Sequence, residues 1–173
     1  MKRILIALVT LCAVPAAAQA PATASTAANS VRPLFAQGAA WVLAAAEQMP
    51  ESEYGFKPTP DIRSFGQLVG HVANAQYMIC SVARGEASPN QQNWEQVTEK
   101  AALIEALRAS TAYCNGAYDL GDEAAMQEVN LFGQQMTRLR VLTLNAAHDF
   151  EHYGNIVTYM RLKGMVPPSS QGD

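Results

Sequence analysis

Hydrophobic residues recur with a helical period in four long segments of the chain, and polar loops rich in proline and glycine separate the segments. No alternating run of apolar and polar residues and no hairpin signal indicates a β-strand. Four helices in a chain of this size predict an all-α four-helix bundle. The expected helices span about 31–49, 65–84, 99–118 and 135–163, with room for one helical turn in the polar connection 121–133.

Capping residues set the expected helix boundaries. Ser64 and Gln67 have the spacing of a capping box at the start of the second helix. Ser30 and Thr98 are the predicted N-caps of the first and third helices, because a hydroxyl at that position accepts a hydrogen bond from the first turn. Gly164 is the residue type expected just past the end of the fourth helix.

The first twenty residues have the pattern of a secretory signal peptide. Lys2 and Arg3 precede an apolar stretch, and Ala18-Gln19-Ala20 provides the small residues of a cleavage site. We therefore expect export to the periplasm or the exterior, with removal of this segment. The predicted organisation is a signal peptide at 1–20, a flexible lead-in at 21–30 and the bundle at 31–170.

Charge excludes several classes of partner. The formal net charge is −3, and loss of Lys2 and Arg3 would make it −5. An acidic chain without a basic run is a poor binder of nucleic acid or of an anionic membrane surface. The second helix carries no formal charge in its interior, but its Gln, His and Asn residues are too polar for a membrane span. We expect a small-molecule partner, no nucleic acid, and no membrane association after cleavage.

Cys80 and Cys114 are the two cysteines beyond the predicted signal peptide. In an oxidising compartment they can form a disulfide, which would stabilise the fold by roughly 3–4 kcal/mol. The alternative is a pair of buried free thiols, since cysteine also packs as a small hydrophobic residue. The sequence leaves both open.

The three histidines of the chain are the candidate chemistry. His148 and His152 are four residues apart, so they lie on one face of the fourth helix, and His71 lies on the second. Three neutral imidazoles hold a divalent metal and leave coordination positions open for water or substrate. The alternative is three hydrogen-bonded core histidines without a metal. Asn155 shares the histidine stripe, and Gln67 lies one turn before His71.

Residues 148–152 also spell H-x-x-E-H, the inverted signature of zinc peptidases, in which Glu151 would be the general base. That signature is short, and a peptidase would need a further carboxylate ligand from another helix. The chain offers no obvious one, so a metallopeptidase is a secondary hypothesis.

Three segments of the chain form a recognisable set: SFGQLVGHVAN at 64–74, NAAHDFEHYGN at 145–155 and TYMRLKGMVPP at 158–168. Together they resemble the DinB-like superfamily, over about residues 31–170. The resemblance implies a four-helix bundle whose metal ligands are His71, His148 and His152, with nickel or zinc as the usual metal and a homodimer as a common assembly. It also implies metal-dependent transfer or isomerisation chemistry on low-molecular-weight thiols.

Two functions follow as hypotheses. The first is an exported metal-dependent enzyme of transferase or hydrolase type, in which Gln67, Glu151 and Asn155 are candidates for orienting ligands or binding substrate. The second is a non-catalytic metal-binding or stress-associated module, because no nucleophile or arginine clamp clearly accompanies the histidines. In a purely structural bundle, chelators would leave the melting temperature unchanged.

Overall fold

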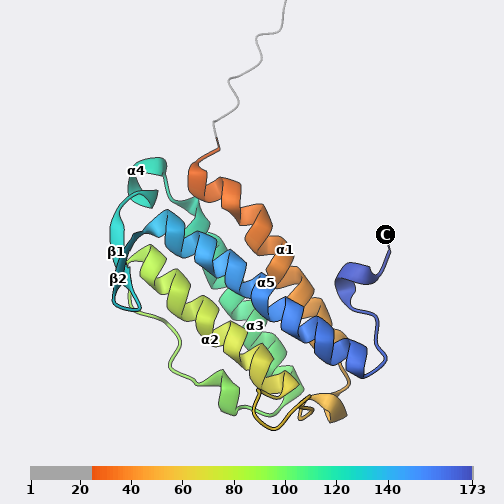
Figure 1. Ribbon diagram of the computed structural model, residues 1–173. Helices are drawn as coiled ribbons and strands as arrows, with labels where there is room; N and C mark the ends of the chain where they lie inside the picture. Colours follow the sequence, from red (N-terminus) through yellow and green to blue (C-terminus); the bar gives the residue numbers. More distant parts are fainter. Residues whose placement is uncertain (1–24, 173) are drawn as a thin grey trace, which may run out of the picture.

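The computed structural model describes residues 25–172, so the predicted signal peptide and its cleavage site lie outside the described residues. The expected all-α bundle is confirmed, with one small β-hairpin added. Figure 1 shows α1 and α5 running in one direction and α2 and α3 in the other. The four long helices are α1 (Ala27–Gln48), α2 (Phe65–Arg84), α3 (Lys100–Asn115) and α5 (Arg138–Leu162).

Because α2 and α3 are parallel, the chain must return along the length of the bundle between them. Residues 85–99 make this return, and we call them the crossover. It contains the short helix η2 (Trp94–Gln96), which packs against α2. Bundles with such long connections are a known variant of the four-helix architecture. The sequence predicted a loop here but not its path over α2.

Helix α2 begins and ends where the sequence predicts. The Ser64 Oγ accepts a hydrogen bond from the Gln67 N–H at 3.2 Å, and the Gln67 Oε1 accepts one from the Ser64 N–H at 2.9 Å. Gly85 ends the helix in the left-handed region, at φ 73°. The helix that carries His71 is therefore fixed at both ends.

Other helix ends differ from the prediction. The Thr26 side chain, rather than Ser30, caps α1, so the helix begins at Ala27 and includes part of the expected flexible lead-in. Ser30 instead donates to the Ala27 carbonyl inside the first turn. The N-cap of α3 is Glu99 rather than Thr98, and no side chain caps that helix.

The prediction that the chain has no strand was wrong. Strands β1 (Glu128–Leu131) and β2 (Gln134–Thr137) form an antiparallel hairpin before α5, after the one-turn helix α4 (Asp122–Ala125). Phe132 and Gly133 form its two-residue turn, both with positive φ, at 54° and 77°. This turn type favours Asn-Gly, and a phenylalanine in that position gives no sequence signal. The remaining short helices are η1 (Glu51–Glu53), η3 (Gly116–Asp119) and η4 (Pro168–Ser170).

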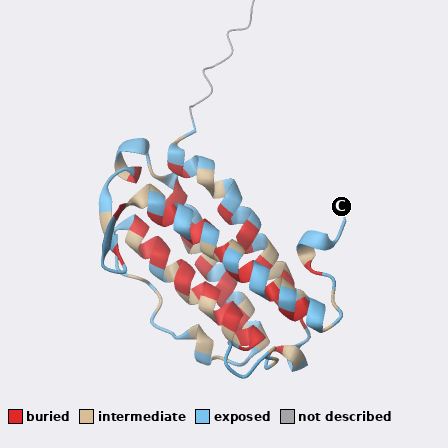
Figure 2. Cartoon of the chain, in the orientation of Figure 1, coloured by how far each residue is buried: buried red, intermediate tan, exposed pale blue. Residues whose placement is uncertain are grey.

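The core consists of two hydrophobic clusters stacked along the bundle axis, one including Phe65 and Leu103 and the other Phe35 and Tyr118. Figure 2 shows the buried residues as stripes on the inner faces of the helices. The disulfide between Cys80 and Cys114 joins α2 to α3 within the second cluster, with Cα atoms 5.3 Å apart. In the part of the chain that the structure describes, no helix is long and apolar enough to span a membrane.

Candidate metal centre

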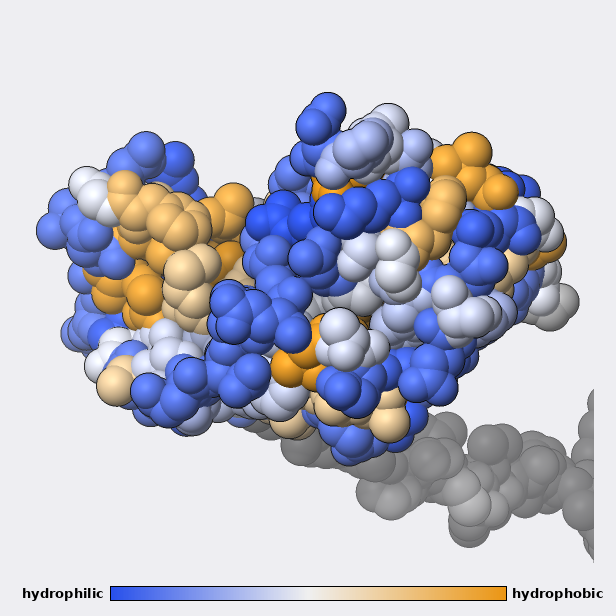
Figure 3. All heavy atoms as spheres, turned by 90° about the horizontal axis from the view of Figure 1, so that it is seen from below, coloured by the Kyte–Doolittle hydropathy of each residue, from blue (hydrophilic) through white to orange (hydrophobic). Residues whose placement is uncertain are grey.

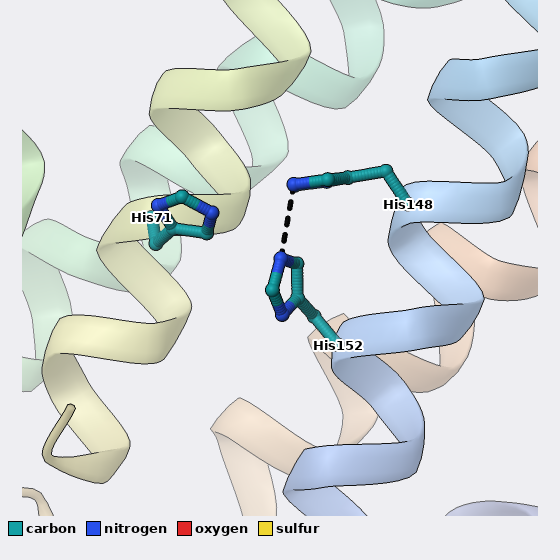
Figure 4. A group of neighbouring side chains, drawn as sticks. All are labelled: His71, His148 and His152. Carbon is teal, nitrogen blue, oxygen red and sulfur yellow. Dashed lines mark hydrogen bonds between the residues drawn. The ribbon is translucent and has the colours of Figure 1, made fainter. Parts of the chain in front are cut away.

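His71 from α2 and His148 and His152 from α5 point toward one another across the space between the two helices (Figure 4). One ring nitrogen from each lies within 4.8 Å of the others, and the Nε2 atoms of His148 and His152 are 2.9 Å apart. Two imidazole nitrogens bound to one tetrahedral zinc ion stand about 3.3 Å apart. The cluster therefore has the dimensions of a three-histidine metal site.

The three histidines reach this arrangement through helix geometry. His148 and His152 are one turn apart on α5, and antiparallel packing of α2 places His71 opposite both of them. The ring centroid of His71 lies 5.3 Å from that of His148 and 4.7 Å from that of His152. Among residues 25–172, this is the one cluster in which three potential ligand side chains converge.

Burial keeps the α5 histidines uncharged. Burial, the largest cause, acts together with the neighbouring His152 and His71 side chains and Arg63 to lower the pKa of His148 to about 3. Burial is also the main reason why the pKa of His152 lies below its ordinary value. Neutral imidazole is the form that binds metal, so at neutral pH no proton has to leave these two ligands first.

A cavity of about 490 Å³ adjoins the cluster on the His152 side. Its size lies in the range of small-molecule sites. Figure 3 shows the molecule from below relative to Figure 1, and on this face hydrophobic residues form separate patches among hydrophilic ones. The cavity is lined by Asp61, Ile62, Arg63, Leu68, Glu95, His152, Asn155 and Tyr159.

The three candidate residues around the ligands have different positions. Asn155 lies beside the cluster, with its Nδ2 3.4 Å from the His152 Nδ1, and it lines the cavity. The Gln67 side chain accepts the capping-box hydrogen bond from the Ser64 N–H, and this role explains its position without a metal or substrate contact. Glu151 is exposed, and the metal cluster contains no carboxylate, so the arrangement gives no support to a metallopeptidase.

Glu95 and Arg63 are two site residues that the sequence did not reveal. The Glu95 Oε1 is 2.8 Å from the His71 Nδ1, and its Oε2 accepts a hydrogen bond from the Arg63 Nε at 2.8 Å. Burial acts to raise the pKa of Glu95, but the hydrogen bonds from Arg63 and His71 outweigh it, so the pKa lies below its ordinary value. Glu95 belongs to the crossover, and nothing in its sequence spacing links it to His71.

Asp149, between the two α5 ligands, is a buried carboxyl that sequence reasoning also missed. It is fully buried, packs against Gly38 of α1, and its Oδ2 accepts a hydrogen bond from the Gln76 Nε2 at 2.9 Å. The Oδ1 of Asp149 and the Oδ1 of Asn145, one turn earlier, have no partner. Asp149 belongs to the buried face of α5, where it lies between Gly38 of α1 and Gln76 of α2.

The buried Asp149 predicts a pH dependence of stability in the metal-free protein. Burial raises its pKa from 3.8 to about 8, with the Gln76 hydrogen bond acting in the opposite direction. Between these two values the folded protein keeps a proton that the unfolded chain releases, so the contribution of Asp149 to stability is highest below about pH 4 and falls as pH rises toward 8. Relative to Asp149→Asn, we expect the wild type to lose roughly 1 kcal/mol of unfolding free energy per pH unit over this range.

The measurement is the free energy of unfolding in urea at pH 5 and pH 8, for both proteins with chelator present. The histidines are common to both, so their titration cancels in the difference. Asp149→Asn should gain stability over the wild type on going from pH 5 to pH 8. Parallel pH profiles would show that the Asp149 carboxyl is already ionised in the folded protein.

Comparison with known proteins agrees with this fold. The chain is 28% identical over 124 residues to the uncharacterized protein YjoA of Bacillus subtilis, which covers 69% of this chain and 79% of that protein. The crystal structure of YjoA superposes with a TM-score of 0.65 at 22% identity, covering 80% of this chain and 94% of that one. A DinB-like protein from Bacillus cereus superposes with a TM-score of 0.68 at 16% identity, covering 78% and 93%.

A third solved structure carries an activity in its name. The mycothiol-dependent maleylpyruvate isomerase superposes with a TM-score of 0.64 at 16% identity, and the match covers 75% of this chain and 60% of that one. At this identity the likeness shows a shared fold. The family model described as the DinB superfamily matches residues 34–156, which include all three histidines. This chain therefore belongs to the DinB superfamily.

Proposed function

We propose that the protein binds a divalent metal, nickel or zinc, through His71, His148 and His152, and that it is a metal-dependent enzyme acting on a small molecule. The observation that carries the proposal is the convergence of three imidazoles beside a cavity of about 490 Å³. Two of these imidazoles are held neutral by burial, which suits metal ligation.

The metal would supply Lewis acidity and would lower the pKa of a bound water or thiol. The protein would supply orientation through groups that line the cavity. Asn155 presents an amide next to His152, and the exposed end of Arg63 offers donors to a polar or anionic group of the substrate. Leu68 and Ile62 give the same cavity an apolar wall.

The reaction is proposed as group transfer or hydrolysis. The maleylpyruvate isomerase is named as dependent on a thiol, mycothiol, and its likeness to this chain shows a shared fold. We propose export to the periplasm or the exterior, supported by the N-terminal sequence pattern and by the disulfide, which suits an oxidising compartment. Low-molecular-weight thiols are scarce there, which favours hydrolysis or transfer without a thiol.

The assembly and the excluded partners are part of the same proposal. We propose a homodimer because this assembly is common in the family, and sedimentation of the mature protein would test it. The acidic charge supports a protein that binds no nucleic acid and no anionic membrane surface.

A second function, a non-catalytic metal-binding or stress-associated module, is favoured by one observation: the cluster itself contains only imidazoles, without a nucleophile or carboxylate.

Elemental analysis of untagged protein tests the metal proposal directly. We expect about one nickel or zinc ion per chain, and a chelator should lower the melting temperature because the metal binds only the folded state. Protein without bound metal, and with no response to added nickel or zinc, would contradict the proposal.

A screen of small molecules then separates the two functions. A ligand that occupies the cavity next to an open coordination position should stabilise only the metal-loaded protein. At a concentration 100 times its dissociation constant it would add about 2.7 kcal/mol. Ligands that stabilise loaded and metal-free protein equally would favour the non-catalytic module.

A further inference from the structure

The crossover lies directly on α2 at the turn that carries His71. At Gly70, an added Cβ would be 2.4 Å from the Trp94 carbonyl oxygen, so the backbone of η2 occupies the space that any side chain would need. One turn later, the Asn74 Oδ1 accepts a hydrogen bond from the Trp94 N–H at 3.2 Å. Gly70 and Asn74 flank His71 in the sequence, and their contacts with Trp94 hold η2 against this turn of α2.

A second hydrogen-bonded link orients Glu95 within the seated crossover. The Asn93 Oδ1 accepts hydrogen bonds from the Asn74 Nδ2 at 2.9 Å and from the Glu95 N–H at 3.1 Å. The Glu95 carboxylate then takes one hydrogen bond from the Arg63 Nε and contacts the His71 Nδ1 with its other oxygen. Both oxygens are therefore engaged, and the carboxylate has little freedom to turn away.

We propose that Glu95 is a positioning residue for His71 and that it sets the affinity and ligand field of the metal centre. Arg63 holds the Glu95 carboxylate, and the contacts of Gly70 and Asn74 with η2 hold its backbone. A carboxylate only accepts hydrogen bonds, so the His71 Nδ1 must carry the proton. The Nε2 lone pair is then fixed as the ligating atom, on the side facing His148 and His152. A carboxylate behind a histidine also increases the electron donation of the imidazole to a metal.

This inference rests on the proposed function, and the test keeps the two separate. The probe is Co²⁺, whose visible absorption reports its ligands, added to metal-free wild type, Glu95→Ala, Glu95→Gln and Glu86→Ala. The last is a matched control, because Glu86 ties the other end of the crossover to Arg84 and Tyr113 without touching a histidine. Competition with a chelator gives the affinities.

We expect Glu95→Ala to weaken Co²⁺ binding by about 10- to 100-fold and to shift the absorption bands. Glu95→Gln should recover part of the affinity, because its amide oxygen still accepts the His71 proton, and Glu86→Ala should match the wild type. Melting of each metal-free variant shows whether the fold is intact.

Three results would count against these proposals in different ways. Unchanged affinity and spectrum in Glu95→Ala would overturn the positioning role. Equal losses in Glu95→Ala and Glu86→Ala would overturn it too, because they would show a general effect of loosening the crossover. Absence of Co²⁺ binding by the wild type would instead remove the proposed metal centre itself.

Discussion

Replacing His148 with alanine should abolish stoichiometric metal binding. The substitution removes one of three ligands and leaves His71 and His152 with two nitrogens, too few to fill a three-histidine site. Loss of a group that only orients a ligand costs 10- to 100-fold in affinity, so loss of the ligand itself should cost more than about 100-fold. The measurement is the metal content after dialysis, together with the melting temperature with and without added nickel or zinc.

Glu151→Ala is the matched control for His148→Ala. Glu151 lies on the same helix between the two α5 ligands, but it is exposed and outside the cluster. The variant should therefore keep one metal ion per chain. It also tests the peptidase hypothesis, in which loss of Glu151 would abolish proteolysis while the metal is retained. Stoichiometric metal in His148→Ala would end the three-histidine assignment.

Breaking the disulfide should produce the largest loss of stability. Cys80 and Cys114 are 34 residues apart in the sequence, and a bridge over that separation restricts the unfolded chain by roughly 3–4 kcal/mol. Both sulfur atoms lie in the second core cluster, among side chains of α1, α2, α3 and α5. A double Cys80→Ala, Cys114→Ala variant should unfold at a clearly lower urea concentration than the oxidised wild type.

Reductant supplies the control for this experiment. Reduced wild type should approach the double variant, and the double variant should not respond to reductant at all. Equal urea midpoints for oxidised and reduced wild type would show that the bridge contributes nothing to stability. Metal affinity should change much less than stability, because the bridge lies on the side of α2 away from His71.

The sequence was most informative where local signals and function coincide. The capping box at Ser64 and Gln67 and the glycine at 85 placed α2 to the residue. The spacing of His148 and His152 put both on one face of α5, and the family resemblance supplied His71 as their partner. Each of these inferences depends on residues fewer than five apart, or on a motif long enough to be recognised.

The features that the sequence concealed depend on contacts between distant segments. The hairpin turn uses Phe132 where the favoured residue is asparagine, so its left-handed conformation gives no signal. Glu95 reaches His71 only because the crossover folds back over Gly70, which no periodicity encodes. Asp149 lies on the buried face of α5, but its enclosure by Gly38 of α1 and Gln76 of α2 depends on contacts between distant segments.

The proposed metal ligands come from two helices that lie far apart along the chain, with the crossover, α3 and the hairpin between them. The helices can form locally, but the three nitrogens meet only after α2 and α5 have packed against each other. Metal uptake would therefore report tertiary assembly, whereas far-ultraviolet circular dichroism reports helix content. A folding intermediate with full helicity and no Co²⁺ absorption would reveal the interval between these two events. The identity of the bound ion would then depend on the site geometry and its imidazole ligands together with the metals available where the chain completes its folding.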